Sequence, residues 1–294
     1  MIIVNPTAGG GRVARLVRSI RERSAREAAT VVVTTRAGDA EELAARAAAD
    51  GVERVVAVGG DGTVQEVVNG LLGGDRGMPT IGILPVGTGN DLARSLGLPR
   101  RIEDAWDVAF GPSTRRIDVA QARCGVRTRW FASAGGIGFD AQVAAAMATR
   151  SGWQRGRAGY LLTTLSELRR FSNRRIRLTL DGQTAEHAVL FVAIANGAYY
   201  GGGMRIAPDA ATDDGALDVC IVGDISRMTA IRQLPNLYRG THGNHPAVAM
   251  ARAHGVTIEG DPETLVHLDG EPFGCLPLEV ELTASRLTVA VPLR

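Results

Sequence analysis

The strongest constraint on the fold is a pattern that occurs four times in about the first 110 residues. Each copy is a short apolar run, then a turn, then an amphipathic segment. The four apolar runs are IIV (2–4), TVVVTT (30–35), RVVAV (54–58) and TIGILP (80–85). Their apolar residues are consecutive rather than alternating, which is typical of parallel strands buried on both faces. The pattern therefore predicts an α/β N-terminal domain with a parallel sheet.

The second half of the chain has a different period. From about residue 117, polar and apolar residues often alternate, as in RIRLTLDGQTAEHAVLFVAIAN, GALDVCIV, GVTIEG and LEVELTA. This pattern predicts a C-terminal antiparallel β-sandwich domain, interrupted by helices at about 154–171 and 226–238. We expect an N-terminal domain over 1–117 and a β-sandwich over 118–285, with a last strand over 286–294 that returns to the first domain.

Three of the four turns after the apolar runs are rich in glycine: NPTAGGGR, GGDGT and GTGND. All three belong to the carboxyl edge of the predicted sheet, where ligands of such sheets bind. Bare backbone amides at helix starts attract phosphate. Asp61, among three glycines, would repel phosphate unless a cation lay between them. We therefore expect the amides to hold phosphate and Asp61 to help hold Mg²⁺, directly or through water.

Local structure offers simpler explanations for parts of these turns. Thr63 and Glu66 have the spacing of a capping box, which would start a helix without any ligand. Asn90 has the position of an ordinary N-cap. Neither explanation accounts for three glycines around one acid, so the nucleotide site remains the stronger hypothesis.

The absence of lysine limits the chemistry. All 33 basic residues are arginine, which excludes a P-loop lysine, a kinase strand lysine and a Schiff base. Arg12, at the start of the first predicted helix, is then a candidate for stabilising a phosphoryl group. Residues 100–177 carry 15 arginines and 6 acids, a net +9, but lack the aromatic interleaving of strand-binding platforms. We therefore expect no nucleic-acid partner.

These motifs, in this order, resemble those of the bacterial diacylglycerol kinase-like lipid kinases, which are related to sphingosine kinases. GGDGT is also similar to the turn of NAD kinase and 6-phosphofructokinase. The second half carries further matching motifs: IDVA (117–120), GGIGFDA (135–141), APDAATDDG (207–215) and HLDGEPFG (267–274). The resemblance covers nearly the whole chain. It implies a lipid kinase with ATP and Mg²⁺ as cofactors.

The resemblance also implies roles for individual residues. The nucleotide contacts of the family correspond here to Asn5, Pro6, Thr7, Ala8, Gly9, Thr34, Gly60, Asp61, Gly62, Thr63, Glu66 and Thr88, with Asn69 and Asp91 near ATP and Mg²⁺. The catalytic base corresponds to the DGE turn, at Asp269 or Glu271. A second, structural Mg²⁺ would be bound by Asp214, with backbone carbonyls near Ala211 and Ala216.

Several of these residues have an alternative explanation. Asp269-Gly270 is a hairpin turn signal, and Asp181-Gly182 has the same local form. The acids around Asp214 lack EF-hand spacing and could be solvated loop residues. His242 and His245 have no zinc-site context, so a polar loop is expected there.

The resemblance implies phosphorylation of a lipid hydroxyl, with diacylglycerol, converted to phosphatidic acid, as the first expectation. The alternatives are another lipid, such as a sphingoid base or phosphatidylglycerol, or a soluble hydroxyl metabolite, as in NAD kinase. The three cysteines are odd in number and far apart, which is typical of reduced thiols in a cytosol. No run of about 18 apolar residues occurs, so we expect no membrane span but a cytoplasmic protein peripherally associated with the inner face of the cell membrane. The helix at 154–171, with Arg155, Arg157, Arg169 and Arg170, either contacts anionic lipid or packs on its own domain. A homodimer is left open.

Overall fold

A computed structural model describes residues 1–74, 78–149 and 157–293, except for five side chains: Arg157, Ala158, Tyr160, Leu161 and Ser285. Arg155, expected on a lipid-facing helix, is outside the described residues, as are the side chains of Arg157, Tyr160 and Leu161. The chain divides into two compact units. Unit 1 comprises Met1–Ile117 and Ser285–Arg294, and unit 2 comprises Asp118–Ala284.

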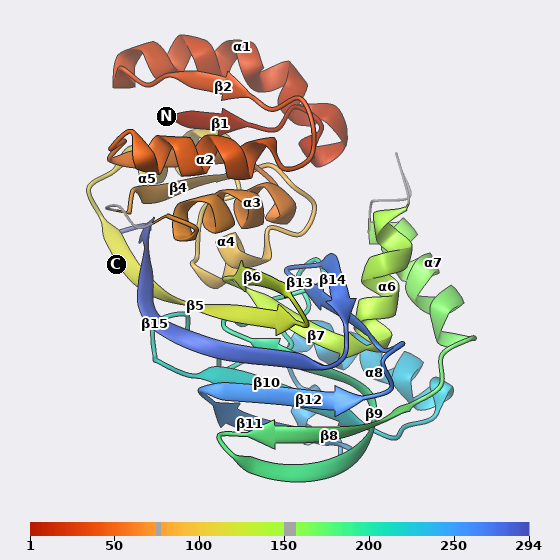
Figure 1. The fold of residues 1–294 in the computed structure, drawn as a ribbon. Helices are drawn as coiled ribbons and strands as arrows, with labels where there is room; N and C mark the ends of the chain where they lie inside the picture. Colours follow the sequence, from red (N-terminus) through yellow and green to blue (C-terminus); the bar gives the residue numbers. More distant parts are fainter. Residues whose placement is uncertain (75–77, 150–156, 294) are drawn as a thin grey trace. The chain divides into compact units, whose positions relative to one another are not determined.

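Unit 1 contains a parallel sheet in the strand order β2-β1-β3-β4, followed by the end of β15 (Figure 1). The strands are β1 (Ile2–Val4), β2 (Val31–Val33), β3 (Arg54–Gly59), β4 (Thr80–Pro85) and β15 (Leu278–Ala290). Strand β15 joins this sheet where Val289 lies beside Ile81 of β4, also in parallel. The predicted parallel sheet is confirmed, and so are the four apolar runs as its strands.

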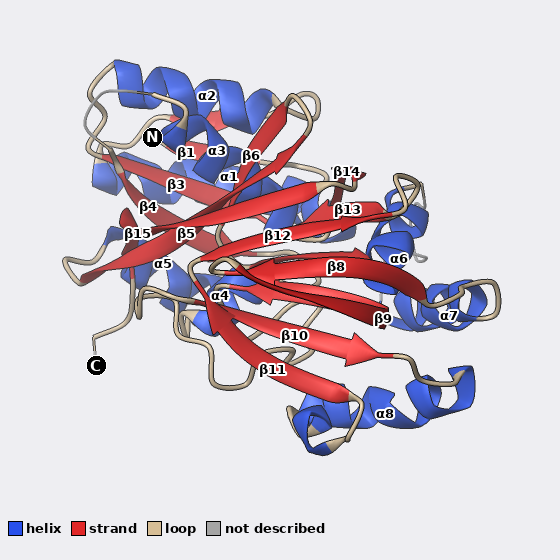
Figure 2. Ribbon diagram, turned by 60° about the horizontal axis from the view of Figure 1, so that its bottom comes forward, coloured by secondary structure: helices blue, strands red, loops and turns tan. Residues whose placement is uncertain are grey.

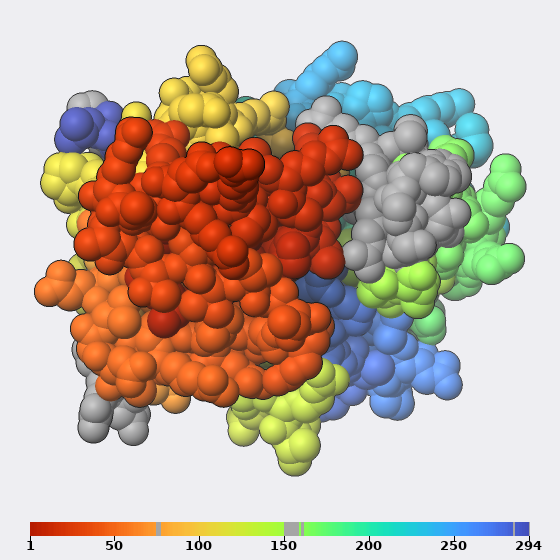
Figure 3. Space-filling view, turned by 90° about the horizontal axis from the view of Figure 1, so that it is seen from above, coloured from red at the N-terminus to blue at the C-terminus, as the bar shows by residue number. Residues whose placement is uncertain are grey.

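Helices pack on this sheet, so the residues of β1, β3 and β4 are mostly buried, whereas the three residues of β2 are half-buried. The helices are α1 (Arg12–Ser24), α2 (Asp39–Ala49), α3 (Asp61–Leu72), α4 (Asp91–Ser95) and α5 (Ile102–Phe110), with short 3₁₀ turns η1 (Ala8–Gly11) and η2 (Ala25–Glu27). Val13 of α1 and Trp106 of α5 pack with Ile2, Val4 and Leu84 in one core cluster. Figure 3 shows the outer surface of unit 1, where the segment of α1 (red) lies beside that of α2 (orange).

Unit 2 is an antiparallel β-sandwich, as expected from its alternating sequence (Figure 2). Its strands are β5 (Thr114–Cys124), which begins in unit 1, β6 (Arg127–Phe131), β7 (Ala134–Gly138), β8 (Arg174–Leu180), β9 (Gln183–Ala195), β10 (Leu217–Gly223), β11 (Val248–Ala253), β12 (Gly255–Gly260), β13 (Leu265–Leu268), β14 (Glu271–Cys275) and most of β15. Strand β9 pairs with β8 along its first half and with β7 and β10 along its second half. One long strand therefore takes part in both layers.

The two faces of β9 belong to two different cores. Val192 and Ile194 face the interior of the sandwich, whereas Phe191 and Ala193 face a second cluster that includes residues from helices. The helices of unit 2 are α6 (Phe139–Ala148), α7 (Arg157–Leu168) and α8 (Arg227–Arg239), with the 3₁₀ turn η4 (His242–Asn244). The helices expected near 154–171 and 226–238 are present, but α6 was not expected. Its sequence, FDAQVAAAMA, has few polar residues, so it shows no clear helical alternation of polar and apolar positions.

The packing of α2 against α3 depends on Gly70. A Cβ atom at Gly70 would lie 2.2 Å from the carbonyl oxygen of Glu41 and 2.9 Å from Cβ of Ala44. Alanine favours a helix interior by about 1 kcal/mol over glycine, but overpacking typically costs about 1–3 kcal/mol. We therefore expect Gly70→Ala to lower the melting temperature. Gly74→Ala, with no atom within 4 Å of the new Cβ, is the control. Equal melting temperatures for the two variants would contradict this account.

Candidate functional site

The three glycine-rich turns of unit 1 touch one another through their backbones at the carboxyl edge of the sheet. A Cβ atom at Gly9 would lie 2.4 Å from the carbonyl oxygen of Val86. One at Gly87 would lie 2.4 Å from Cα of Gly60. Side chains at these positions would force the turns apart. Glycine is therefore required here by close approach, and the turns bring their backbone groups into one small region.

Asn5 joins the first turn to the second. Its side-chain oxygen accepts hydrogen bonds from the backbone N–H and the hydroxyl of Thr7, at 3.0 and 2.8 Å. Its Nδ2 donates to Oγ1 of Thr63 at 3.0 Å. Thr63 also closes over Gly59, where a Cβ atom would lie 2.3 Å from the same hydroxyl oxygen. These contacts fix the orientation of the first turn.

Asp61 joins the second turn to the third. The backbone N–H of Asn90 donates to its Oδ2 at 2.7 Å, and the N–H of Asp91 donates to its Oδ1 at 2.6 Å. Burial raises the pKa of the Asp61 carboxyl above its ordinary value, against the lowering effect of these backbone hydrogen bonds and of Arg94. The carboxylate thus caps helix α4 from another element.

The expected capping box is wrong. Helix α3 begins at Asp61, so Thr63 lies inside it, and its N-cap Gly60 has no side chain to bond. Glu66 instead accepts hydrogen bonds from the N–H groups of Gly38 and Ala40, at 3.0 and 3.1 Å, at the start of α2. Two acids of α3 therefore hold the N-termini of two other helices.

Asn90 occupies the N-cap position of α4, as its place in the sequence indicated, but it does not cap the helix with its side chain. The side chain of Asn90 makes no cap hydrogen bond and donates back to the carbonyl of Gly87 at 2.9 Å. Its Oδ1 is buried and has no hydrogen-bond partner among the described residues. This amide oxygen and the Asp61 carboxylate are both hard oxygen donors of the kind that suits Mg²⁺.

The remaining residues predicted to bind nucleotide lie at the same edge, with one exception. Pro6 and Ala8 are in the first turn, Thr34 directly follows β2, Gly62 is in the first turn of α3, and Thr88 is exposed in the turn after β4. Arg12 is exposed at the start of α1, and its Nε donates to the Gly9 carbonyl at 3.0 Å.

Asn69 is the exception. It is buried and bonds the carbonyl of Gln65 within α3. It lies eight residues beyond Asp61, which is about 12 Å along a helix. Its position near ATP and Mg²⁺ therefore stays a prediction.

The DGE turn connects β13 to β14 in unit 2. Asp269 and Gly270 both have positive φ, 49° and 83°, as a type I′ hairpin turn requires. The Asp269 carboxylate accepts three backbone N–H groups, from Ala132 at 3.2 Å, Ser133 at 3.0 Å and Ala134 at 2.9 Å. Glu271 is exposed at the start of β14. The turn thus offers one carboxylate anchored to the backbone beside β7 and one at the surface.

The Asp181-Gly182 turn between β8 and β9 is a close match to the DGE turn. Its φ values are 45° and 84°. Its carboxylate also accepts backbone N–H groups, from His254 at 3.0 Å and Gly255 at 2.8 Å. Hydrogen bonds from these backbone groups lower the pKa of Asp181. Local geometry therefore does not separate a catalytic turn from a structural one, and Asp181 becomes a matched control for Asp269.

A buried histidine–aspartate pair lies two residues before the DGE turn. Nε2 of His267 is 3.1 Å from Oδ2 of Asp140, and both side chains are almost fully buried. Gly136 makes room for the pair, since a Cβ atom there would lie 2.4 Å from the Asp140 oxygen. The ring of Tyr200 stacks on His267. Sequence reasoning missed this pair, although both residues lie in the motifs GGIGFDA and HLDGEPFG.

In the loop predicted to bind a second Mg²⁺, the proposed metal ligand is paired with an arginine. Asp214 forms an ion pair with Arg252, and its Oδ1 accepts the N–H of Ala216 at 3.3 Å. Across the described parts of the chain, no group of three or more His, Cys, Asp or Glu residues is arranged to hold a metal. A magnesium ion at Asp214 would therefore need mainly backbone carbonyls, such as those of Ala211 and Ala216.

The prediction of a polar loop is wrong for His242 itself. This side chain is buried, and its Nε2 lies 3.0 Å from the Ile206 carbonyl and 3.7 Å from Sγ of Cys220. Burial lowers the pKa of His242, so the neutral ring is favoured. The residue is part of the core of unit 2.

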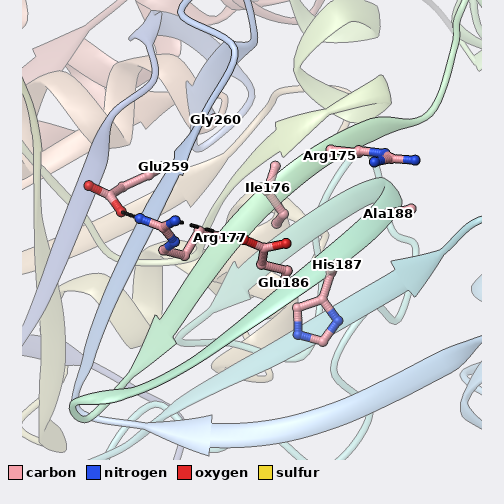
Figure 4. A pocket seen from close by; sticks show the side chains of 8 residues that line it. All are labelled: Arg175, Ile176, Arg177, Glu186, His187, Ala188, Glu259 and Gly260. Carbon is pink, nitrogen blue, oxygen red and sulfur yellow. Dashed lines mark ion pairs between the residues drawn. The ribbon is translucent and has the colours of Figure 1, made fainter.

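An open depression of about 570 Å³ lies on β8, β9 and β12 (Figure 4). Arg177 is at its centre, 3.7 Å from the carboxylate of Glu186 and 3.5 Å from that of Glu259. None of its lining residues is among those predicted to bind nucleotide, metal or lipid. Its charges are balanced within the sheet, so it adds nothing to the candidate site.

Comparisons with known proteins cover both units of the chain. The family model "Diacylglycerol kinase catalytic domain" matches residues 1–122, and "YegS C-terminal NAD kinase beta sandwich-like domain" matches residues 133–291. A Mycobacterium tuberculosis protein named "Diacylglycerol kinase" is 35% identical over 99% of this chain and 94% of its own length. The chain belongs to the diacylglycerol kinase family. It is therefore a lipid kinase.

Solved structures of this lipid kinase family show the same fold. The crystal structure of a putative diacylglycerol kinase from Bacillus anthracis has a TM-score of 0.82 and 29% identity, and covers 99% of this chain and 94% of that one. An NAD kinase from Archaeoglobus fulgidus, solved in complex with ATP, has a TM-score of 0.55 at 12% identity and covers 98% of this chain and 92% of that one. The second likeness concerns the fold alone. No helix among the described residues of this lipid kinase could span a membrane.

We expect the His267–Asp140 pair to be important for the stability of the lipid kinase. His267→Leu would leave a buried oxygen of Asp140 without this hydrogen-bond partner, which typically costs about 1–3 kcal/mol. His254→Leu is the control, because it breaks a histidine–aspartate contact of 3.4 Å that is exposed. Thermal melting should show a large loss for the first variant and almost none for the second. Similar losses would contradict the importance of the buried pair.

Proposed function

We propose that this lipid kinase transfers the γ-phosphoryl group of ATP, with Mg²⁺, to the hydroxyl group of diacylglycerol and so forms phosphatidic acid. One observation carries the proposal. The chain matches a protein named diacylglycerol kinase over 99% of its length, through both the unit with the glycine turns and the unit with the DGE turn. The geometry of each unit supports a part of the reaction.

The glycine turns of unit 1 are proposed to bind the phosphates of ATP. Their close backbone approach leaves little room for side chains around the region where α1, α3 and α4 begin. Helix N-termini and bare amides favour anions there. Asn5, Thr7, Gly9, Gly60, Thr63 and Thr88 are the proposed contacts nearest these turns, and Asn69 is the proposed contact that the geometry supports least.

The oxygen donors at the turns fit a magnesium ion. The Asp61 carboxylate and the side-chain oxygen of Asn90 lie at the same turn, and the buried Asn90 oxygen has no hydrogen-bond partner among the described residues. When bound, Mg²⁺ would neutralise charge on the phosphate oxygens. Asp61 would orient that ion directly or through water, while continuing to hold the backbone of Asn90 and Asp91.

Arginines would supply the remaining positive charge, because the chain has no lysine. Arg12 has its Nε on the Gly9 carbonyl, which holds its guanidinium beside the first turn. Arg94 donates from Nε to the Gly89 carbonyl at 2.7 Å and lowers the pKa of Asp61. Both side chains are anchored at Nε, so the terminal nitrogens are the groups proposed to face phosphate.

The DGE turn is proposed to provide the base. A carboxylate of this turn would accept the proton of the lipid hydroxyl as its oxygen attacks the phosphorus atom. Asp269 is held rigidly by three backbone N–H groups, and Glu271 is exposed beside it. One would accept the proton and the other would orient the substrate or the metal.

The acceptor is the main point to test. Labelled ATP should be offered with diacylglycerol, monoacylglycerol, phosphatidylglycerol, a sphingoid base and NAD. We expect the highest kcat/KM with diacylglycerol, because of the match to diacylglycerol kinases. Preference for NAD would overturn the lipid substrate, and preference for another lipid would correct it.

Asp269→Asn tests the base. Asn-Gly is as good a type I′ turn as Asp-Gly, so the turn should persist, although some hydrogen bonds to the backbone are lost. Turnover should fall about 10²–10⁴-fold, as is typical when a general base is removed. Glu271→Gln should also lower turnover.

Asp181→Asn is the matched control, since Asp181 holds backbone groups in the same way. It should lower the melting temperature, as Asp269→Asn does, and leave turnover unchanged. If Asp269→Asn and Glu271→Gln both keep wild-type turnover, the proposed mechanism is wrong.

Asp61→Asn tests the metal. The amide would replace one acceptor oxygen with a donor that faces a backbone N–H, so we expect a stability loss of about 1–3 kcal/mol and a higher Mg²⁺ requirement. Activity is measured against Mg²⁺ concentration at saturating ATP. Asp39→Asn is the control, because Asp39 also accepts backbone N–H groups, from Thr35 and Arg36. Wild-type activity of Asp61→Asn at limiting Mg²⁺ would remove Asp61 from the metal site.

Three further proposals concern the surroundings of the enzyme. A second Mg²⁺ at Asp214, Ala211 and Ala216 would have to compete with Arg252 for the Asp214 carboxylate. A membrane surface is the proposed location of the lipid substrate, on the inner face of a cell membrane. The third proposal is that the enzyme forms a homodimer.

A further inference from the structure

One long segment of unit 2 contains no acidic residue. Between residues 225 and 258 there is no Asp or Glu, although the chain has 31 of them among 294 residues. The same segment carries four arginines and three histidines. It comprises α8, η4, β11 and the first part of β12. Acids of other elements pair with Arg252 and His254, whereas the arginines of α8 have no acid within the segment.

The outward face of α8 combines apolar and cationic side chains. Met228, Ile231 and Tyr238 are 58%, 36% and 47% exposed, and Arg232 and Arg239 are exposed beside them. The spacings 228, 231, 232, 235, 238 and 239 all fall on one side of a helix. Ala230 and Leu237 face the opposite way, into the core cluster of unit 2. The exposed stripe is thus a continuous face of one helix.

Exposed large apolar side chains are concentrated here. Seven occur in the described part of the chain, and four of them lie in the acid-free segment: Met228, Ile231, Tyr238 and Met250. Met250 of β11 lies close to Gly243 of η4. Helix α8 follows β10 and precedes η4 and β11 at the edge of unit 2 (Figure 2). Single exposed apolar residues are ordinary on a protein surface, but a group of them is a sign of an interaction site.

We propose that α8 docks unit 2 onto a bilayer surface that contains anionic lipid headgroups. Met228, Ile231 and Tyr238 enter the boundary between headgroups and acyl chains, and Arg232 and Arg239 bind headgroup phosphates. Arg227 contributes charge from a fixed position, since its terminal nitrogen donates to the Phe171 carbonyl at 3.2 Å. This inference deepens the proposed function, because a lipid acceptor is presented at such a surface.

Charge decides between a membrane and a second copy of the chain. In a two-fold dimer through α8, the same face would meet itself, and its arginines would oppose one another with no acid in the segment to pair with them. Anionic headgroups offer the complementary charge over the whole face. The helix face therefore fits the lipid surface better than it fits itself.

Co-sedimentation with vesicles tests the docking without any need for catalysis. Wild type should bind vesicles of phosphatidylcholine with phosphatidylglycerol, and binding should weaken with added salt and on vesicles of phosphatidylcholine alone. Arg232→Gln and Arg239→Gln should each weaken binding about fivefold. Ile231→Glu should abolish it, with an unchanged melting temperature because the side chain is exposed.

Val126→Glu is the matched control. Val126 is fully exposed in the turn between β5 and β6, so the variant adds the same charge away from α8. It should bind vesicles like wild type. Equal binding by Ile231→Glu and Val126→Glu, or equal binding to neutral and anionic vesicles, would overturn the proposal. A dimeric wild type that Ile231→Glu converts to a monomer would assign the face to self-association instead.

A second measurement separates this proposal from the proposed function. Turnover of a short-chain diacylglycerol, dissolved as monomers, should be the same in wild type and Ile231→Glu. Turnover of a long-chain diacylglycerol in anionic vesicles should be lost only in the variant. Equal loss on both substrates would overturn docking by α8. If no diacylglycerol is phosphorylated by wild type, the proposed function fails, while vesicle binding still decides the role of α8.

Discussion

The structure depends on carboxylates that bind backbone N–H groups of distant segments. Asp61 holds Asn90 and Asp91, Glu66 holds the start of α2, and Asp269 holds three residues 135–137 positions away in sequence. Asp118 holds Gly215 in the same way at 2.8 Å. A hydrogen bond from a backbone N–H to a charged acceptor is stronger than a neutral one. These bonds join turns that secondary structure leaves unconnected.

This arrangement makes candidate catalytic residues structural as well. Asp61 and Asp269 are both candidates for chemistry, and both already satisfy backbone groups that would otherwise be unpaired. Rigid anchoring is an advantage for a reacting group, because its position is fixed before substrate binds. It also means that loss of activity in a variant has two explanations. The chain itself provides controls in Asp39 and Asp181, which hold backbone groups without a proposed catalytic role.

The use of arginine alone gives the enzyme its particular electrostatics. An arginine can be fixed through Nε while its terminal nitrogens remain directed elsewhere, as at Arg12 and Arg94. Where acids are near, arginines are paired, as Arg252 is with Asp214 and Arg177 with two glutamates. Along α8 the sequence supplies no acid, so the charge stays at the surface. Local acid content thus separates structural arginines from those that can bind an external anion.

The sequence by itself determined the two fold classes, because the period of apolar residues follows directly from how each strand is buried. It also indicated the three glycine turns, because glycine is needed where backbones come within van der Waals contact. The partners of Asp61, Glu66 and Asp269 were decided only by the tertiary structure. A capping box at Thr63 and Glu66 is the better local solution, but Glu66 is needed at the start of α2, which lies more than 25 residues earlier. Likewise, Asp269 and Asp181 have the same local sequence and the same turn, and His242 is buried although its neighbours are polar. Local sequence specifies the turn, whereas the groups that a side chain finally contacts depend on which strands the fold brings beside it.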